Sequence, residues 1–187
     1  MTLSQWAQKG RSDSLTETVL GLVIVGAVLM VAVQSKNVTS FGRASAAGSG
    51  GKVTAIRRAI IGQESAGNFK AVNPHSGALG YGQVMPENVP SWTKEALGRS
   101  LTTDEFLADP KIQIKVIDFK LNQYYQEGLK KSGGDEEVAV RWVASTWYSG
   151  QGKWWNDTTP QFYNGHPYPS INDYTASVFV KYQQEKK

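Results

Sequence analysis

Apolar and polar residues divide the chain into three zones. Val19–Val33 is an uninterrupted apolar run, VLGLVIVGAVLMVAV, whereas Ser35–Lys52 is rich in Ser, Gly and Ala and holds almost no large apolar residue. From Val53 onward, apolar residues recur at helical spacing between Gly-rich loops. The pattern predicts an N-terminal segment over 1–34, a flexible linker over 35–52 and a folded domain over 53–187.

The periodicity of the folded domain predicts about five or six helices. Ile56, Ala59 and Ile60 lie on one stripe of a helix, and Gly67 supplies its stop. Later helices are expected to start at a cap residue or at a first-turn proline, at Pro86, Asp109-Pro110, Asp135 and Ser170. No run of alternating residues is long enough for a sizeable sheet, so the sequence predicts an all-α domain.

The apolar run Val19–Val33 has two interpretations. As a transmembrane anchor it covers about 22 Å, somewhat less than the ~30 Å hydrocarbon core of a bilayer. As a cleaved signal peptide it has a typical length, and Ala44-Ser45-Ala46 has the small-x-small pattern of a cleavage site. Because that pattern lies well beyond the run, the anchor is the favoured interpretation.

Composition excludes several kinds of chemistry. The chain has no Cys and only two His, His75 and His166, which lie far apart. Disulfides, thiol nucleophiles and Cys-based zinc sites are therefore excluded, and neither a metal nor a cofactor is expected. The net charge of +4, part of which lies in the N-terminal segment, is too small to predict a nucleic-acid partner but suits an anionic polymer such as a cell wall.

The first chemical candidate is Glu64, in the stretch GQESAGNF. It follows Ile60 and Ile61 and precedes small, turn-prone residues at an expected helix end. A carboxyl group flanked by apolar side chains and partly shielded from water has a raised pKa, as a general acid near neutral pH requires. Taken alone the signal is weak, because most helical glutamates are exposed surface residues.

A Gly-rich stretch follows, NPHSGALGYGQVMP. Its glycines Gly77, Gly80 and Gly82 permit positive φ and let the backbone approach a ligand closely. Gln83 offers both a donor and acceptors to amide or hydroxyl groups. The stretch lacks a GK[ST] ending and a preceding strand, so it does not fit a phosphate-binding loop.

Together the two stretches resemble the lytic transglycosylase (SLT) family of lysozyme-like proteins. In QESAGNFKAVNPHSGALGYGQVMP the Glu-Ser pair, the Gly-Asn turn and the Gly-Ala-Leu-Gly-x-x-Gln-Val-Met-Pro segment occur in the family's order and separation. The resemblance implies a goose-lysozyme-like α fold over roughly Val53–Tyr182, with Glu64 as the single catalytic acid/base. It also implies that Ser65 supports Glu64 or contacts substrate, and that Gln83 and Met85 line the sugar cleft.

Two later segments depart from the family pattern. TWYSGQG aligns with Ala-Tyr-Asn-Ala-Gly-x-Gly, so that Trp147 replaces the usual Tyr and Tyr148 the usual Asn. The ring of Tyr148 is then a candidate for stacking on a sugar face. Helical spacing places Trp142 and Trp147 in the core, whereas Trp154 and Trp155 in the following loop are candidates for substrate contact.

Further departures lie in the Gly-rich loop and near the C-terminus. Tyr81 and Gly82 replace a commoner Leu-Met pair before the Gln, which is expected to reshape one subsite. The segment DYTASV resembles the family's final Tyr-Val-x-x-Val motif, with Thr175 in place of Val. Tyr174 is then the candidate whose hydroxyl reaches the catalytic carboxyl group.

The resemblance implies cleavage of the β-1,4 bond between N-acetylmuramic acid and N-acetylglucosamine. Glycosidases usually use two carboxylates, and neither motif supplies a partner for Glu64. A single-acid scheme, in which Glu64 protonates the leaving oxygen and then helps to close a 1,6-anhydro ring, resolves this. A goose-type lysozyme that hydrolyses the same bond, and an inactive peptidoglycan-binding module, are the alternatives.

The expected partners follow from this assignment. They are the glycan strands of peptidoglycan, the membrane through the N-terminal helix, and cell-envelope or virion assembly proteins, with no nucleic acid. The catalytic domain is expected outside the cytoplasm, in the periplasm, or on a virion membrane if the protein is phage-encoded.

Overall fold

The computed structural model describes residues 42–163 and 166–186. The predicted N-terminal segment over 1–34, including the apolar run, lies outside the described residues. Among the helices that are described, none combines the length and the hydropathy needed to cross a bilayer.

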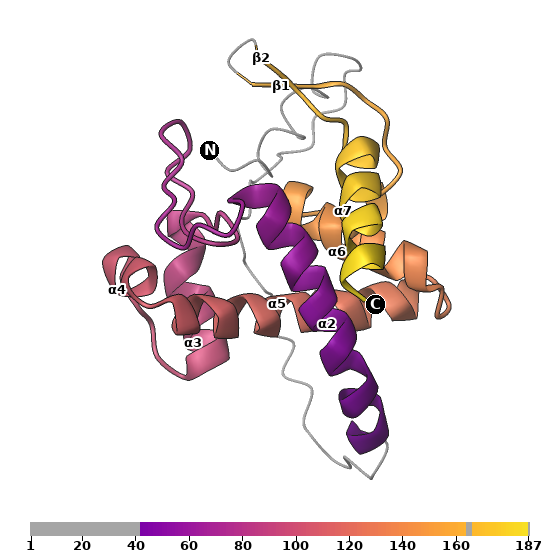
Figure 1. Ribbon diagram of the computed structural model, residues 1–187, viewed down its shortest axis with the longest axis horizontal. Helices are drawn as coiled ribbons and strands as arrows, with labels where there is room; N and C mark the ends of the chain where they lie inside the picture. The colour runs from indigo at the N-terminus through magenta and orange to yellow at the C-terminus, as the bar shows by residue number, and fades with distance from the viewer. Residues whose placement is uncertain (1–41, 164–165, 187) are drawn as a thin grey trace, which may run out of the picture.

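The described chain is mostly helical (Figure 1). It contains six α-helices, two short 3₁₀-helices and one β-hairpin, in the order α2 (Gly42–Glu64), η1 (Pro86–Asn88), α3 (Val89–Leu97), α4 (Thr103–Ala108), α5 (Pro110–Lys131), α6 (Glu136–Ser149), η2 (Gly152–Trp154), β1 (Gln161–Tyr163), β2 (His166–Tyr168) and α7 (Ile171–Glu185). The predicted number of helices and the helical class are thus confirmed. The short hairpin was not predicted.

Several of the described helices begin where capping side chains satisfy the first free amide groups. Asp109 accepts hydrogen bonds from the amides of Lys111 and Ile112 at the start of α5. Asp135 caps α6 and Ser170 caps α7 in the same way. The start that was predicted at Pro86 is a 3₁₀ turn, which passes directly into α3.

Helix α5 joins two hydrophobic clusters. It crosses the molecule with α3 and α4 packed at one end and α2 and α6 at the other, where α7 packs in turn on α2 and α6 (Figure 1). Ile117 of α5 belongs to the larger cluster, with buried residues that include Ile56, Ile60, Val143 and Val178. Its neighbour Val116 belongs to the smaller cluster, with Leu79, Val84, Val89 and Phe106. Adjacent faces of one helix therefore hold both halves of the domain together.

Helix α2 begins earlier than the sequence pattern predicts. It starts at Gly42, so helix replaces the predicted linker from residue 42 to residue 52. Ala has the highest helix propensity of the amino acids, and the Ala residues between 42 and 47 offset the Gly and Ser residues around them. Gly50 and Gly51 have open space where a Cβ atom would lie, so α2 is not closely packed at these two positions.

A cluster of charged and hydroxyl groups ties the end of α7 to α2 and α6. Glu136 accepts hydrogen bonds from the Lys52 ammonium at 2.6 Å, from the Tyr182 hydroxyl at 2.9 Å and from Lys186. The hydrogen bonds from Lys186 and then Lys52 lower the pKa of Glu136 from 4.5 to about 2, against the opposing effect of burial. The carboxylate at residue 136 therefore fastens three helices while it is ionised.

We expect Glu136→Gln to lower the free energy of unfolding by about 1–2 kcal/mol at pH 7. The folded-state pKa is depressed, so the stabilisation is fully present above the unfolded pKa and is lost as the pH falls toward about 2. Urea denaturation of the wild type and of Glu136→Gln between pH 7 and pH 3 measures the difference in their free energies of unfolding, which should become smaller as the pH falls.

The matched control is Glu185→Gln, which removes a single exposed ion pair to Arg58 and should change stability by less than about 0.5 kcal/mol. A Glu136→Gln effect that stays constant over the whole pH range would contradict the assignment of the stabilisation to the ionised carboxylate.

Candidate active site

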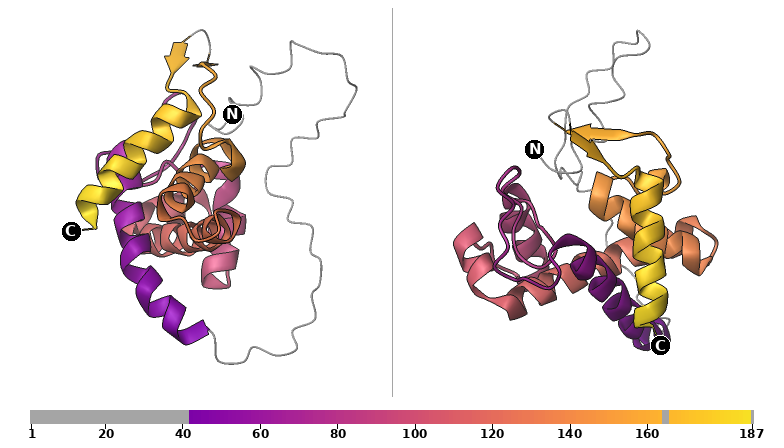
Figure 2. Two further views of the ribbon diagram at one scale, coloured as in Figure 1. Left: turned by 90° about the vertical axis from the view of Figure 1, so that its right-hand side faces the viewer. Right: turned by 45° about the horizontal axis from the view of Figure 1, so that its top comes forward.

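Glu64 is the last residue of α2, and the backbone turns sharply after it. Ala66 and Gly67 both have positive φ, at 50° and 83°, which ends the helix. The chain then enters the Gly-rich loop. Figure 2 shows this loop and the β1–β2 hairpin projecting at the same side of the molecule as the end of α2. Glu64 therefore lies at the point where α2 passes into the Gly-rich loop.

The carboxyl group of Glu64 is held by a tyrosine from the last helix. The hydroxyl of Tyr174 in α7 donates a hydrogen bond to Oε1 of Glu64. The ring of Tyr174, only 4% exposed, stacks on Tyr148 of α6 with 4.2 Å between ring centroids and 16° between planes. Tyr148 in turn donates a hydrogen bond to the carbonyl oxygen of Pro169 at 3.1 Å. Helices α2, α6 and α7 thus meet at the acid.

The surroundings of Glu64 change its protonation. Burial raises the pKa of this carboxyl group to about 7, although the hydrogen bond from Tyr174 partly opposes that effect by stabilising the ionised form. Burial, followed by the charge of Glu64, raises the pKa of Tyr174 well above its usual value. Tyr174 therefore remains a neutral donor near pH 7, while Glu64 is divided between its two protonation states.

The Gly-rich loop is joined to the residue after the acid. The hydroxyl of Ser65 donates a hydrogen bond to the carbonyl oxygen of Tyr81 at 2.8 Å. Within the loop, Leu79 forms isolated β-bridges to both Val72 and Val84. Ser65 therefore attaches the loop to the end of α2, while its implied support of Glu64 or contact with substrate stays a prediction.

Gln113 of α5, which the sequence pattern did not single out, holds the backbone of the Gly-rich loop in place. Its side chain is fully buried, accepts a hydrogen bond from the amide of Tyr81 at 2.9 Å and donates one to the carbonyl oxygen of Phe69 at 2.9 Å. The sequence does contain a signal for this role. Gln113 lies three residues before Val116 and four before Ile117, so helical spacing places this polar residue on the apolar side of the helix.

Two of the loop glycines are required by close packing. A Cβ atom on Gly80, which has φ +67°, would lie 2.1 Å from Oε1 of Gln113. One on Gly82 would lie 2.8 Å from the ring of Trp147, whose Nε1 donates a hydrogen bond to the carbonyl oxygen of Gly82 at 3.1 Å. The ring of Trp147 thus occupies the space that a side chain at residue 82 would need.

The structure places the other predicted substrate residues in different settings. Gln83 has φ +50° and donates a hydrogen bond to the carbonyl oxygen of Gly80 at 3.2 Å. Met85 is 7% exposed, so most of its side chain is buried. Tyr81 is half-buried, with its ring centroid 6.0 Å from that of Phe69. Substrate contact by these residues stays a prediction.

Stacking of Tyr148 on a sugar face stays a prediction. One face of its ring is packed on Tyr174, and the residue is 4% exposed. The reason is its position on the buried face of α6, where the ring fills the core beside the acid. In this structure Tyr148 supports Tyr174.

The tryptophans also find protein partners. Trp147 is half-buried against Trp92, with ring centroids 5.5 Å apart, and Trp142 lies against Gly152, where no Cβ atom would fit. Trp155 lies under the guanidinium group of Arg141 at 4.5 Å, and Trp154 packs against the larger cluster. Contact of Trp154 or Trp155 with substrate stays a prediction.

The described residues contain no group of three or more His, Cys, Asp or Glu side chains arranged to hold a metal ion. The chemistry that the site itself displays is that of one carboxyl group with a pKa of about 7 and a neutral hydroxyl donor beside it. This pairing suits a group that gives up a proton and later takes one back.

We expect Gly80→Ala to reduce stability and activity more than Gly77→Ala. Both positions have positive φ, +67° and +73°, so both variants carry a backbone strain of about 1–2 kcal/mol. Only at residue 80 does the new methyl group displace Gln113, because the nearest atom at residue 77 is 3.6 Å away. Thermal unfolding of the two variants checks this, and equal losses would contradict the role given to Gln113.

Comparison with known protein families agrees with this geometry. The family model described as the transglycosylase SLT domain matches residues 45–156, which is more than half of the chain. The match includes Glu64 and the Gly-rich loop and ends before the hairpin and α7. No curated protein and no solved structure matches the chain significantly. This chain therefore belongs to the SLT transglycosylase family of the lysozyme-like superfamily, whose members cleave glycosidic bonds in peptidoglycan.

Proposed function

We propose that the protein is a peptidoglycan lytic transglycosylase in which Glu64 is the single acid/base. One observation carries the proposal: a carboxyl group with a pKa of about 7 lies in the family's Glu-Ser motif and is held by a neutral tyrosine hydroxyl. A catalytic group is most effective when its pKa is near the working pH, because both of its protonation states are then accessible.

In the first step Glu64 acts as a general acid. It donates its proton to the glycosidic oxygen between N-acetylmuramic acid and N-acetylglucosamine, and the bond from that oxygen to C1 of the muramyl sugar breaks. The N-acetylglucosamine leaves with its 4-hydroxyl restored. Positive charge develops at C1, where the N-acetyl group of the substrate is placed to stabilise it. The Tyr174 hydroxyl stabilises the carboxylate that Glu64 has become.

In the second step the same carboxylate acts as a general base. It accepts the proton of the muramyl 6-hydroxyl while O6 bonds to C1, so that a 1,6-anhydro ring closes and Glu64 is protonated again. Neither the Glu64 motif nor the Gly-rich motif contains a second carboxylate. This favours ring closure by the substrate's own hydroxyl over a mechanism with two acids.

The Gly-rich loop is the proposed wall of the sugar site. Ser65 attaches it beside the acid, and Gln113 and Trp147 hold its backbone from below. Gln83 and Tyr81 are only half-buried and are available to contact sugar hydroxyl and amide groups. Met85 is almost fully buried and contributes to the shape of the loop. We further propose that the apolar run over Val19–Val33 keeps the enzyme at the membrane, with peptidoglycan on the side of the folded domain.

The primary test uses the purified full chain on cell-wall sacculi. Mass spectrometry should find muropeptides that end in 1,6-anhydro-muramic acid, and Glu64→Gln should lower their release by about a thousandfold or more. Glu127→Gln, which changes an exposed glutamate on α5, is the matched control and should retain full activity.

The products separate this proposal from its two alternatives. Reducing-end muramic acid, heavier by one water, would indicate a hydrolase of the goose-lysozyme type. Binding to sacculi with no soluble product would indicate a peptidoglycan-binding module. Undiminished turnover by Glu64→Gln would exclude Glu64 as the acid.

We also expect Tyr174→Phe to raise the pKa of Glu64 further above 7. The lost hydrogen bond favoured the ionised carboxyl group, so its removal strengthens the protonated form and raises the pKa. The alkaline limb of the activity profile, where the acid loses its proton, should therefore move to higher pH. Turnover against pH measures the shift, and an alkaline limb that moves to lower pH would contradict it.

A further inference from the structure

Helix α6 holds the first turn of α7 at two points. Arg141 and Tyr148 are seven residues apart on α6, and therefore lie two turns apart on one face of the helix. Tyr148 stacks on Tyr174 and bonds to Pro169, just before α7 begins. Arg141 donates hydrogen bonds to Asn172 and Thr175, on either side of Tyr174. The proposed donor to the acid is thus bracketed by contacts from a neighbouring helix.

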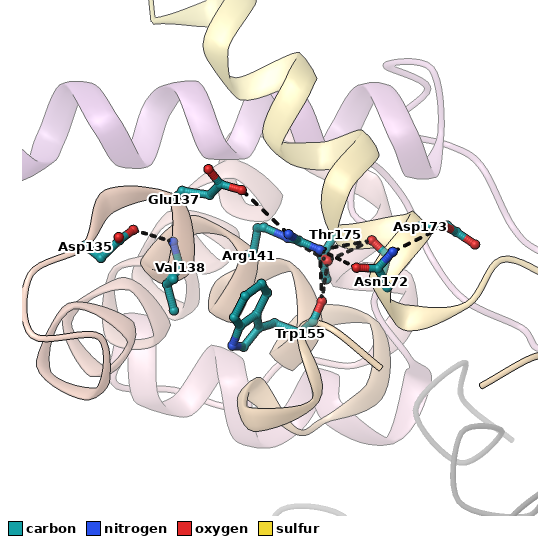
Figure 3. A network of polar contacts seen from close by, with 8 residues as sticks. All are labelled: Asp135, Glu137, Val138, Arg141, Trp155, Asn172, Asp173 and Thr175. Atoms are coloured by element: carbon teal, nitrogen blue, oxygen red, sulfur yellow. Dashed lines mark hydrogen bonds and ion pairs between the residues drawn. The ribbon is translucent and has the colours of Figure 1, made fainter. Parts of the chain in front are cut away.

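Arg141 makes an extensive set of contacts for a side chain that is only 11% exposed. Its Nη2 donates to the side-chain oxygen of Asn172 at 2.7 Å and lies 3.4 Å from that residue's carbonyl oxygen (Figure 3). Its Nε donates to Oγ1 of Thr175 at 3.2 Å. These two residues lie two positions before and one position after Tyr174. The guanidinium fork therefore spans the turn of α7 that carries the donor.

The loop after α6 closes this network. The carbonyl oxygen of Trp155 accepts hydrogen bonds from Thr175 Oγ1 at 2.7 Å and from Nη2 of Arg141 at 3.4 Å (Figure 3). The ring of Trp155 lies 4.5 Å from the guanidinium carbon, and the amide of Asn172 bonds to the carbonyl oxygen of Asp157 at 2.9 Å. Arg141 is thus fixed by stacking as well as by hydrogen bonds, which limits its own motion.

We propose that Arg141 is a positioning residue, which sets the place of the Tyr174 hydroxyl relative to Glu64 without contacting substrate. The proposal rests on the acid/base role proposed for Glu64. Hydrogen bonding depends steeply on distance and angle, so a shift of about 1 Å in the first turn of α7 would break the Tyr174–Glu64 bond.

Few charged groups act on Glu64, so a pH profile can report this effect. The hydrogen-bonding group that shifts its pKa is Tyr174 of α7, and the ring of Tyr148 from α6 interacts with its charge. Burial raises the pKa of both tyrosines, which therefore stay neutral at the pH of an assay. The ion pair of Arg141 with Glu137 faces solvent, where Glu137 is 53% exposed, and is not needed for the effect.

The test compares Arg141→Met, Arg141→Lys and Tyr174→Phe in the full chain on soluble glycan strands. We expect Arg141→Met to lower kcat by about tenfold, with KM changed by less than about twofold. Its alkaline limb should move to higher pH, toward that of Tyr174→Phe. Arg141→Lys keeps a charge and one donor but loses the planar fork, so it should restore only part of the rate.

A double variant distinguishes positioning from a general loss of structure. If Arg141 acts through Tyr174, the variant Arg141→Met with Tyr174→Phe should be no slower than Tyr174→Phe alone, within about twofold. If the double variant instead lost rate by the product of the two single effects, Arg141 would have a role independent of Tyr174, and the proposal would be overturned. If Arg141→Met unfolds below the assay temperature, a wild-type rate and pH profile in Arg141→Lys would overturn it as well.

Two control variants match the physical changes. Lys120→Met removes another buried cation, which pairs with Glu95 at 3.0 Å and lies over the ring of Trp92, both on α3. It should leave the pH limb in place, as should Glu137→Gln. A wild-type kcat and pH limb in folded Arg141→Met, while Glu64→Gln is inactive, would overturn this inference alone. Activity in Glu64→Gln would refute the proposed function itself.

Discussion

The hydrogen bond from Tyr174 to Glu64 is the contact on which the organisation of the site depends. It joins residues 110 positions apart, at the end of the first described helix and near the start of the last. Every element that supports either residue therefore contributes to the protonation of one carboxyl group. The bond is buried enough for desolvation to dominate, yet it favours ionisation. These opposing effects leave the pKa of Glu64 close to neutrality instead of far above it.

The second constraint is steric and acts on the loop beside the acid. Gly80 and Gly82 lie so close to Gln113 and Trp147 that larger residues do not fit. The side-chain amide of Gln113 and the indole of Trp147 thereby hold the loop backbone. Each also makes a hydrogen bond to a polar backbone group of the loop. A loop fixed in this way presents its outer surface without having to be ordered by the substrate, which reduces the entropic cost of binding.

The starts of several helices could be predicted because local chemistry determines them. Asp109, Asp135 and Ser170 act as caps through groups two or three residues away. The roles of Tyr148 and Arg141 could not be predicted in this way. Their partners lie on α7 and in the loop before it, and only the packing of helices brings them together. Likewise, the composition of residues 42–52 indicated a linker, although the helix that follows extends through it.

Because α2 is continuous, it fixes both the distance and the direction from Gly42 to Glu64. A straight α-helix of this length measures about 34 Å from Gly42 to Glu64. Whatever precedes Gly42 joins the domain at the opposite end of this rod from the acid (Figure 1). The helix thus acts as a spacer of fixed length, and attachment through the N-terminal side would leave the proposed catalytic carboxyl group at the far end of the helix from the point of attachment. Each residue inserted into that spacer would also rotate its two ends relative to each other by about 100°.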